Sequence, residues 1–438
     1  MGVDSPQRDR EEEEGHSGWR PRRQVAAWAL WDFATTPYSV VISTVVFPTF
    51  FKETIMGGDP AGDFLWGVTG SLATFLVILL APAAGAYADA AAAKHRLLNA
   101  FTLLNIAAVF ALALLGPGTV VAGVLLFVLA SVGWQAGSVF YSAFLPEIAP
   151  FHRQGFASGL GDGLGYVGAL MAMGVALLIY RVNPVGEGLG EVRPLFVFVG
   201  TFTLLAALPS FLVLRDKPCA TAPTRVSIRG GFARELQTLR HVHRYPNTFR
   251  FLLAFLFYTD AVTTMTAFVS IYARSENLTL SQIMLIFFLG QLTAAPASVG
   301  LGRLADRIGA KATIYMLLVL WLAVLGYGLL ANAFVDFLIV GLMAGAGVGA
   351  LSAVSRTMMS QVSPPEKQAE FFGFQAVAGR ASAVIGPPIV GAISWLAGGT
   401  RPALPVLMLL LVVAMFILRK VKVEAPAGPD PEPTSHCS

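Results

Sequence analysis

The chain has 438 residues, of which 55% are hydrophobic and 13% carry a charge. Soluble domains carry about 25% charged residues, so this composition excludes an ordinary soluble protein and favours a membrane protein. The formal net charge of +4 reflects where basic residues lie relative to apolar stretches, so it does not indicate nucleic-acid binding.

Twelve apolar stretches are long enough to cross a bilayer as helices. In chain order they are expected at 24–50, 64–88, 97–116, 119–146, 155–180, 194–214, 249–273, 281–302, 312–331, 334–361, 371–397 and 402–419. The predicted fold class is therefore an all-α integral membrane protein with twelve transmembrane helices in two six-helix, pseudo-symmetric bundles.

Basic residues favour one side of these stretches. With both termini in the cytoplasm, the predicted inner segments hold 23 Lys and Arg residues and the predicted outer loops hold five. By the positive-inside rule, the chain is expected to be a multi-pass protein of the cell inner membrane with both termini cytoplasmic. The first residues, which include the acidic run 11–14, do not resemble a signal peptide.

Composition divides the chain into five parts. A cytoplasmic tail (1–23) precedes the first bundle (24–214), a polar linker (215–248) precedes the second bundle (249–420), and a Pro-rich tail (421–438) is expected to be disordered. The linker has apolar residues and a histidine at helical spacing: Phe232, Leu236, Leu239 and His243. This spacing predicts an amphipathic helix on the inner membrane surface.

Landmarks recur between the two halves. The pairs are Asp32 and Asp260, 228 positions apart; Gly85–Asp89 and Gly302–Asp306, 217 apart; and Gly159 and Gly373, 214 apart. A slowly drifting offset is what an old duplication with small insertions leaves. A parallel repeat of six spans is the arrangement of major facilitator transporters.

The segment 302–311 resembles the loop motif of the major facilitator superfamily, whereas its first copy, 85–94, keeps only the Gly and the Asp. In that superfamily these loops act as a latch in which the Asp accepts hydrogen bonds near a helix N-terminus. For Asp89, a tight charged turn explains the residue equally well. The predicted latch residues are Asp89, Gly302, Asp306, Arg307, Arg356 and Glu370.

Six short stretches resemble one branch of this superfamily, the bacterial "unknown major facilitator" family, which is related to fungal vacuolar amino-acid effluxers. They are 28–34, 145–148, 251–255, 258–260, 355–356 and 369–373. The resemblance implies a major facilitator fold and efflux of a small solute. That family has an Asn close to each intramembrane Asp, whereas Thr35 and Thr259 stand at those places here.

Asp32 and Asp260 are the strongest candidate site residues. Each lies in an apolar stretch, where a carboxylate costs roughly 2.5–3.5 kcal/mol at the helix centre. We expect both to lie near the middle of the membrane and to face one central cavity, where burial favours the protonated form. At least one is predicted to be a proton-coupling or substrate-amine site. The alternative is a carboxylate that fixes helix packing through hydrogen bonds.

Neighbouring groups complete the candidate site. Thr35, Thr259, Tyr38 and Tyr258 flank the two carboxylates. Pro37 has no N–H, so we expect it to kink the first span and to free a carbonyl toward the cavity.

Two arginines and a third aspartate lie within other spans. Arg380 is expected to hold a substrate carboxylate or phosphate, or to pair with Asp162 or Asp260 in a gate. Arg356 lies near the cytoplasmic end of its span, where pairing with Asp306 or Glu370 is favoured. The six histidines all fall in predicted cytoplasmic segments, which excludes an intramembrane histidine relay.

The chain has no phosphate-binding loop, nucleophile triad or Cys/His metal cluster, so we expect no enzyme activity, cofactor or metal. The leading hypothesis is a monomeric secondary transporter that works by alternating access. It is expected to export a small polar or amphipathic solute, such as an amino acid, in exchange for protons, through a site lined by helices 1, 4, 7 and 10. The partners are the solute, protons and membrane lipids, without nucleic acid. The alternatives are a lipid or glycolipid translocase and a non-transporting scaffold or receptor.

Overall fold

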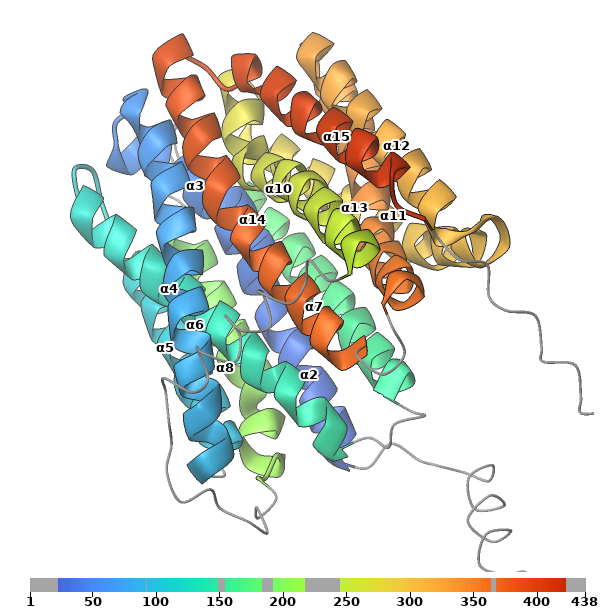
Figure 1. The fold of residues 1–438 in the computed structure, drawn as a ribbon. Coiled ribbons are helices and arrows are strands. Elements are labelled where there is room, and N and C mark those ends of the chain that lie inside the picture. The colour runs from blue at the N-terminus through green and yellow to red at the C-terminus, as the bar shows by residue number, and fades with distance from the viewer. Residues whose placement is uncertain are drawn as a thin grey trace, which may run out of the picture.

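The computed structural model describes residues 23–91, 93–148, 154–182, 192–216, 245–363 and 368–422. Every regular element in these ranges is helical (Figure 1), and twelve helices are long and apolar enough to cross a membrane. The predicted fold class is confirmed. Most of the predicted linker, with its amphipathic helix, and nearly all of both tails lie outside the described residues.

The first six spans form one bundle. The first span runs through α2 (Arg23–Pro37), η1 (Tyr38–Val46), α3 (Phe47–Phe50) and η2 (Phe51–Ile55). The other five are α4 (Ala61–Ala91), α5 (Lys94–Leu112), α6 (Val120–Ile148), α7 (Gln154–Val182) and α8 (Arg193–Val213).

The second bundle also has six spans. They are α10 (Pro246–Ser275), α11 (Leu280–Ile308), α12 (Ala310–Leu330), α13 (Phe334–Val362), α14 (Gln368–Ala397) and α15 (Leu404–Arg419), with a short 3₁₀ turn, η7 (Arg401–Ala403), before the last. The two bundles repeat one packing scheme. The contacts of α2 with α7 and α8 correspond to those of α10 with α14 and α15. The contact of α4 with α6 likewise corresponds to that of α11 with α13.

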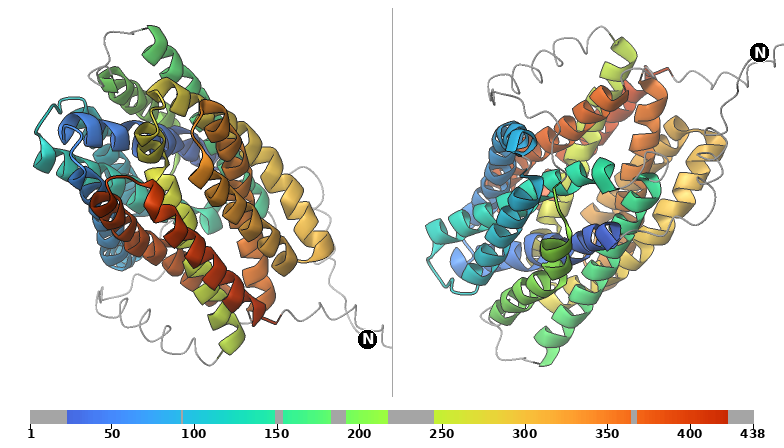
Figure 2. Two further views of the ribbon diagram at one scale, coloured as in Figure 1. Left: turned by 90° about the horizontal axis from the view of Figure 1, so that it is seen from above. Right: turned by 90° about the horizontal axis from the view of Figure 1, so that it is seen from below.

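The two bundles meet through α4 with α14 and α7 with α11, and η1 and α3 of the first span also contact α10. Figure 1 shows α4 and α14 side by side, and Figure 2 shows the bundles from both ends. We call the end where α2 begins and α15 ends the terminal end, and the opposite end the distal end.

The first span changes its winding at Pro37. The segment from Tyr38 to Val46 is π-helical, which is the wider winding often found where a helix carries a functional site. The carbonyl of Phe33 loses its usual donor because Pro37 has no N–H. That carbonyl lies against Gly168 of α7, where an added Cβ would come within 2.2 Å of the oxygen. It therefore faces α7 and not the cavity, which corrects our expectation.

Aromatic side chains fill the distal part of the first bundle. Phe47 stacks on Phe127 with ring centroids 4.8 Å apart and meets Phe196 edge to face. Phe47, Phe50 and Phe51 are buried. Aromatics at 47–51, like those at 249–257, are compatible with the apolar half-cavity that the lipid-translocase alternative predicts, but the rings of Phe47, Phe50 and Phe51 belong to the packed core.

Candidate functional site

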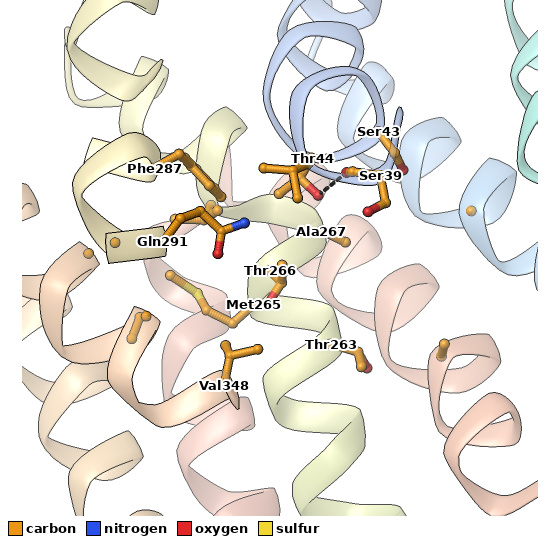
Figure 3. Close-up of a pocket in the computed structure, with 18 of the residues that line it drawn as sticks. Ser39, Ser43, Thr44, Thr263, Met265, Thr266, Ala267, Phe287, Gln291 and Val348 are labelled. Carbon is orange, nitrogen blue, oxygen red and sulfur yellow. Dashed lines mark hydrogen bonds between the residues drawn. The ribbon is translucent and has the colours of Figure 1, made fainter. Parts of the chain in front are cut away.

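A cavity of about 670 Å³ lies between the two bundles (Figure 3). The predicted helices 1, 4, 7 and 10 all contribute to its wall, as parts of α2 and η1, α6, α10 and α13. Helices α4, α7, α11, α12 and α14 contribute as well. Because both bundles build the wall, a rocking motion of one bundle against the other would reshape the site.

Neutral polar groups face each other across this cavity. Figure 3 shows Ser39, Ser43 and Thr44 on the first span opposite Gln291 on α11. The Thr44 hydroxyl donates to the Ser39 carbonyl at 2.8 Å, and the Ser39 hydroxyl donates to the Thr36 carbonyl at 3.0 Å. Since these donors are used within the helix, the hydroxyl oxygens present acceptor lone pairs to a solute. Sequence reasoning did not find this group, although Ser39 and Ser43 recur at helical spacing in an otherwise apolar stretch.

Arg380 is the one charged residue among the described residues that line the cavity. It reaches the wall from α14. A guanidinium has five N–H donors in a plane and matches a carboxylate or a phosphate in a two-pronged geometry. Trp66, Trp134 and Trp321 supply aromatic surface to the same wall. The cavity therefore suits a solute with an apolar body and an anionic group.

Asp32 lies between α2 and α7. A Cβ added at Gly165 of α7 would come within 2.7 Å of Asp32 Oδ2, so the glycine makes room for the carboxylate. The Thr36 hydroxyl donates to Asp32 Oδ1 at 3.2 Å. No ion pair within 4 Å involves Asp32 in the described part of the chain, although Asp162 lies within electrostatic range. We had expected Asp32 to line the cavity, but it does not. Thr36, one turn further along α2, lines it instead.

Asp260 occupies the equivalent place between α10 and α14, with a side chain that is 5% exposed. Its Oδ1 accepts a hydrogen bond from the backbone N–H of Gly386 at 3.0 Å and another from the Thr264 hydroxyl at 3.3 Å. Asp260 also lies behind the cavity wall, which Thr263 reaches. The repeat therefore places both carboxylates between the first and fifth helices of their own bundle.

The two predicted tyrosines tie helices together. The Tyr38 hydroxyl bonds to Ser131 Oγ at 2.9 Å, and the Tyr258 hydroxyl bonds to Ser355 Oγ at 2.7 Å. Both rings are fully buried. The Thr35 hydroxyl, in turn, donates to the carbonyl of Trp31 in its own helix at 3.0 Å. The two tyrosines and Thr35 do not line the cavity. Thr259 does not line it either, and its carbonyl accepts a hydrogen bond from the Thr263 hydroxyl.

Asp162 and Arg356 face each other from opposite bundles. Both side chains are exposed, Asp162 on α7 and Arg356 on α13, and they lie within electrostatic range of each other. We had expected Arg356 to pair with Asp306 or Glu370, and a pair with Asp162 was one of the alternatives for Arg380. The side chains of Asp306, Glu370 and Asp89 lie outside the described part of the structure. Of the remaining latch residues, Gly302 has open space beside it and Arg307 is exposed.

An ion pair and a side-chain hydrogen bond of the described residues join the bundles at the distal end. The guanidinium of Arg274 on α10 donates two hydrogen bonds to the carboxylate of Glu53 on η2, each 2.6 Å long. Asp63 on α4 forms an ion pair with Lys52, whose ammonium nitrogen lies 2.7 Å from Asp63 Oδ1. The two groups are not oriented as a hydrogen bond. Asp63 also accepts a hydrogen bond from Ser394 on α14. We had counted these basic residues only as outer-loop charges.

The backbones of α4 and α14 also touch near the distal end. A Cβ at Gly67 would come within 2.2 Å of the carbonyl oxygen of Pro387, and one at Gly391 within 2.5 Å of the carbonyl oxygen of Asp63. Glycine permits this approach because it has no side chain. The distal end of the interface between the bundles is therefore closed by the Arg274–Glu53 ion pair and by backbone contact.

The described residues include no group of three or more His, Cys, Asp or Glu side chains that could hold a metal ion.

Comparisons with known proteins agree with this architecture. A family model described as "Vacuole effluxer Atg22 like" matches residues 66–427. The uncharacterised MFS-type transporter YxiO of Bacillus subtilis (strain 168) is 28% identical over 414 residues, which cover 92% of this chain and 95% of that protein. Autophagy-related protein 22 of Vanderwaltozyma polyspora is 26% identical over 301 residues, which cover 61% of this chain and 56% of that protein.

Two solved structures share the fold. The nucleoside transporter NupG has a TM-score of 0.68 at 13% identity, over 91% of this chain and 98% of that chain. A bacterial homologue of the human lysosomal transporter Spinster, in an inward-facing and unoccupied conformation, has a TM-score of 0.67 at 14% identity, over 94% and 100%. Because the family model covers most of the chain, this protein is a transporter of the major facilitator superfamily and belongs to the family of proteins like the vacuole effluxer Atg22.

Proposed function

We propose that this protein exports a small polar or amphipathic solute that carries a carboxylate, such as an amino acid, in exchange for protons. The observation that carries the proposal is the cavity between the two bundles, which Arg380 reaches and which is closed at its distal end. A site between two halves that is sealed at one end is what alternating access requires.

Arg380 is the proposed anchor for the solute carboxylate. The hydroxyl oxygens of Ser39, Ser43 and Thr44 accept hydrogen bonds from the amino or other donor groups of the solute. The tryptophans of the wall pack against its apolar part. A neutral or cationic solute would not make the two-pronged contact with this guanidinium, so the same cavity should bind it more weakly.

Asp32 is the proposed proton site. No cation contacts it among the described residues, and Asp162 adds a second negative charge nearby. A carboxylate in such a place gains by taking up a proton. We further infer that the terminal end faces the cytoplasm of the cell inner membrane and that the protein acts as a monomer. The linker 215–248 then tethers the two bundles on that side.

Flux measurements in proteoliposomes test the proposal. A pH gradient should drive net movement of carboxylate-bearing solutes, and the corresponding amides should move more slowly. Asp32→Asn should abolish the effect of the gradient and retain solute exchange, because the cavity wall is unchanged. Arg380→Gln should weaken carboxylate transport at least tenfold, whereas Arg250→Gln, at the exposed start of α10, should not.

Three outcomes would contradict the proposal. Flux without any pH dependence would indicate a uniporter. Movement of phospholipids instead of soluble solutes would favour the translocase alternative. No flux of any solute or lipid would favour a scaffold or receptor.

A further inference from the structure

The carboxylates of Asp32 and Asp260 occupy equivalent places in the two bundles but accept hydrogen bonds from different groups. Asp32 accepts a hydrogen bond from Thr36 on its own helix and lies against Gly165, without a described bond to the backbone of α7. Asp260 instead binds the backbone amide of Gly386 on α14. Only Asp260 is therefore joined by a hydrogen bond to the fifth helix of its bundle, among the residues that the structure describes.

The amide that Asp260 binds lies at a weak point of α14. Gly386 is followed by Pro387 and Pro388, and two consecutive prolines remove two backbone N–H donors from the helix. In a membrane core no water replaces lost backbone hydrogen bonds, and each unsatisfied group costs several kcal/mol. The Asp260 oxygen accepts the Gly386 N–H beside these prolines, so it ties α14 to α10 where α14 has lost two of its own hydrogen bonds.

The same point of α14 makes the contact with the other bundle. The carbonyl of Pro387 faces Gly67 on α4, and Pro387 also lines the cavity. The space around Asp260 is equally tight, because a Cβ at Gly386 would come within 2.3 Å of its Oδ1 and 2.2 Å of Thr264 Oγ1. A continuous set of contacts thus runs from Asp260, through two residues of α14, to the distal contact between the bundles.

We propose that Asp260 is a positioning residue that holds the proline segment of α14 against α4 and so keeps the distal end closed. The inference rests on the proposed function in one respect, that closure of the distal end is a state of a transport cycle. It assigns different roles to the two aspartates. Asp32 exchanges the proton, and Asp260 acts through its hydrogen bond to Gly386, which needs an acceptor oxygen and not a titratable group.

Two substitutions separate an acceptor from a proton site. Asp260→Asn keeps an oxygen that can accept the Gly386 N–H, whereas Asp260→Leu removes it. Gly386→Ala keeps the Asp260 carboxylate but displaces it. The matched control is Gly379→Ala, whose added methyl group lies at an ordinary contact distance, 3.4 Å from Phe255. The measured quantity is the distance distribution between spin labels at Val121→Cys and Leu396→Cys, which lie at the distal end on opposite bundles and are 73% and 81% exposed.

The measurement is made on the full chain in nanodiscs, with Cys219→Ser and Cys437→Ser as background. Asp260→Leu and Gly386→Ala should each raise the ratio of long to short distances at least fivefold. Asp260→Asn and Gly379→Ala should stay within twofold of the background. If Asp260→Leu does not purify as a monodisperse protein, Gly386→Ala supplies the same test.

Two results would overturn the inference. If Asp260→Asn opened the distal end as far as Asp260→Leu does, the charge or the proton would matter and not the acceptor. If neither Asp260→Leu nor Gly386→Ala changed the distances, the carboxylate would not hold α14. The readout needs neither a solute nor a pH gradient, so it can fail or succeed independently of the proposed transport activity.

Discussion

The two ends of the interface between the bundles differ in how opposite charges meet. At the distal end, Arg274 and Glu53 are joined by two short hydrogen bonds. Toward the terminal end, Asp162 and Arg356 stand on opposite bundles within electrostatic range, but no ion pair within 4 Å joins them. The difference indicates that one end is latched while charges at the other end are still apart. Rocking of the bundles would exchange the two arrangements.

Backbone contact should contribute more to distal closure than the ion pair. Gly67→Ala places a methyl group 2.2 Å from the carbonyl of Pro387, and overpacking of this kind costs about 1–3 kcal/mol. The ratio of open to closed distal ends should therefore rise at least about fivefold. Spin-label distances between Val121→Cys and Leu396→Cys measure this ratio.

Gly70→Ala is the matched control, one turn along the same helix, where an added Cβ meets nothing within 4 Å. The assignment of this contact would be wrong if the two alanine variants gave the same distance distribution.

The distal ion pair should have the next largest effect. Glu53→Gln removes the charge that Arg274 binds, and a hydrogen bond to a charged group contributes about 1.5–3 kcal/mol before solvent screening. Both side chains are between a quarter and a third exposed, so we expect about 1 kcal/mol and roughly a fivefold shift toward open distal ends.

The charge-reversed double variant, Glu53→Arg with Arg274→Glu, should recover part of the closed population. A double variant as open as Glu53→Gln would mean that the pair does not latch the bundles.

The terminal charges should have the smallest effect. Asp162→Asn removes an attraction between exposed groups, and such pairs contribute about 0–1 kcal/mol. We expect the population with an open distal end to fall by up to about threefold, because closure of the terminal end loses a favourable contact. The effect should shrink at high salt.

Arg356→Gln should produce the same change, and the double variant should add little to either single one. Independent, additive effects of the two substitutions would show that the charges do not meet in any populated state.

The sequence predicted the helices and the repeat well, because long apolar stretches and matched landmarks are strong signals in a membrane protein. It predicted less well which way side chains face. Spans such as α12 are apolar along most of their length, since both lipid and protein neighbours favour apolar groups. The carboxylates of Asp32 and Asp260 could thus be placed in depth but not in rotation, and they turned out to lie behind the cavity wall.

Two further features could not be read from pattern. The π winding from Tyr38 to Val46 has no signature in the amino-acid pattern, because its residues are as apolar as those of an ordinary membrane-spanning helix. The pairing of Glu53 with Arg274 joins residues 221 positions apart. Only the packing of the two bundles brings them together.

The central claim is that the two bundles rock about the cavity so that its ends open in alternation. The most direct test compares spin-label distances at both ends in one set of conditions, with the distal pair above and a terminal pair at Arg96→Cys and Phe249→Cys, which are exposed on opposite bundles. A change that lengthens the distal distance, such as Gly67→Ala, should shorten the terminal distance in the same proportion of molecules. Terminal distances that stay constant while distal distances lengthen would contradict alternating access.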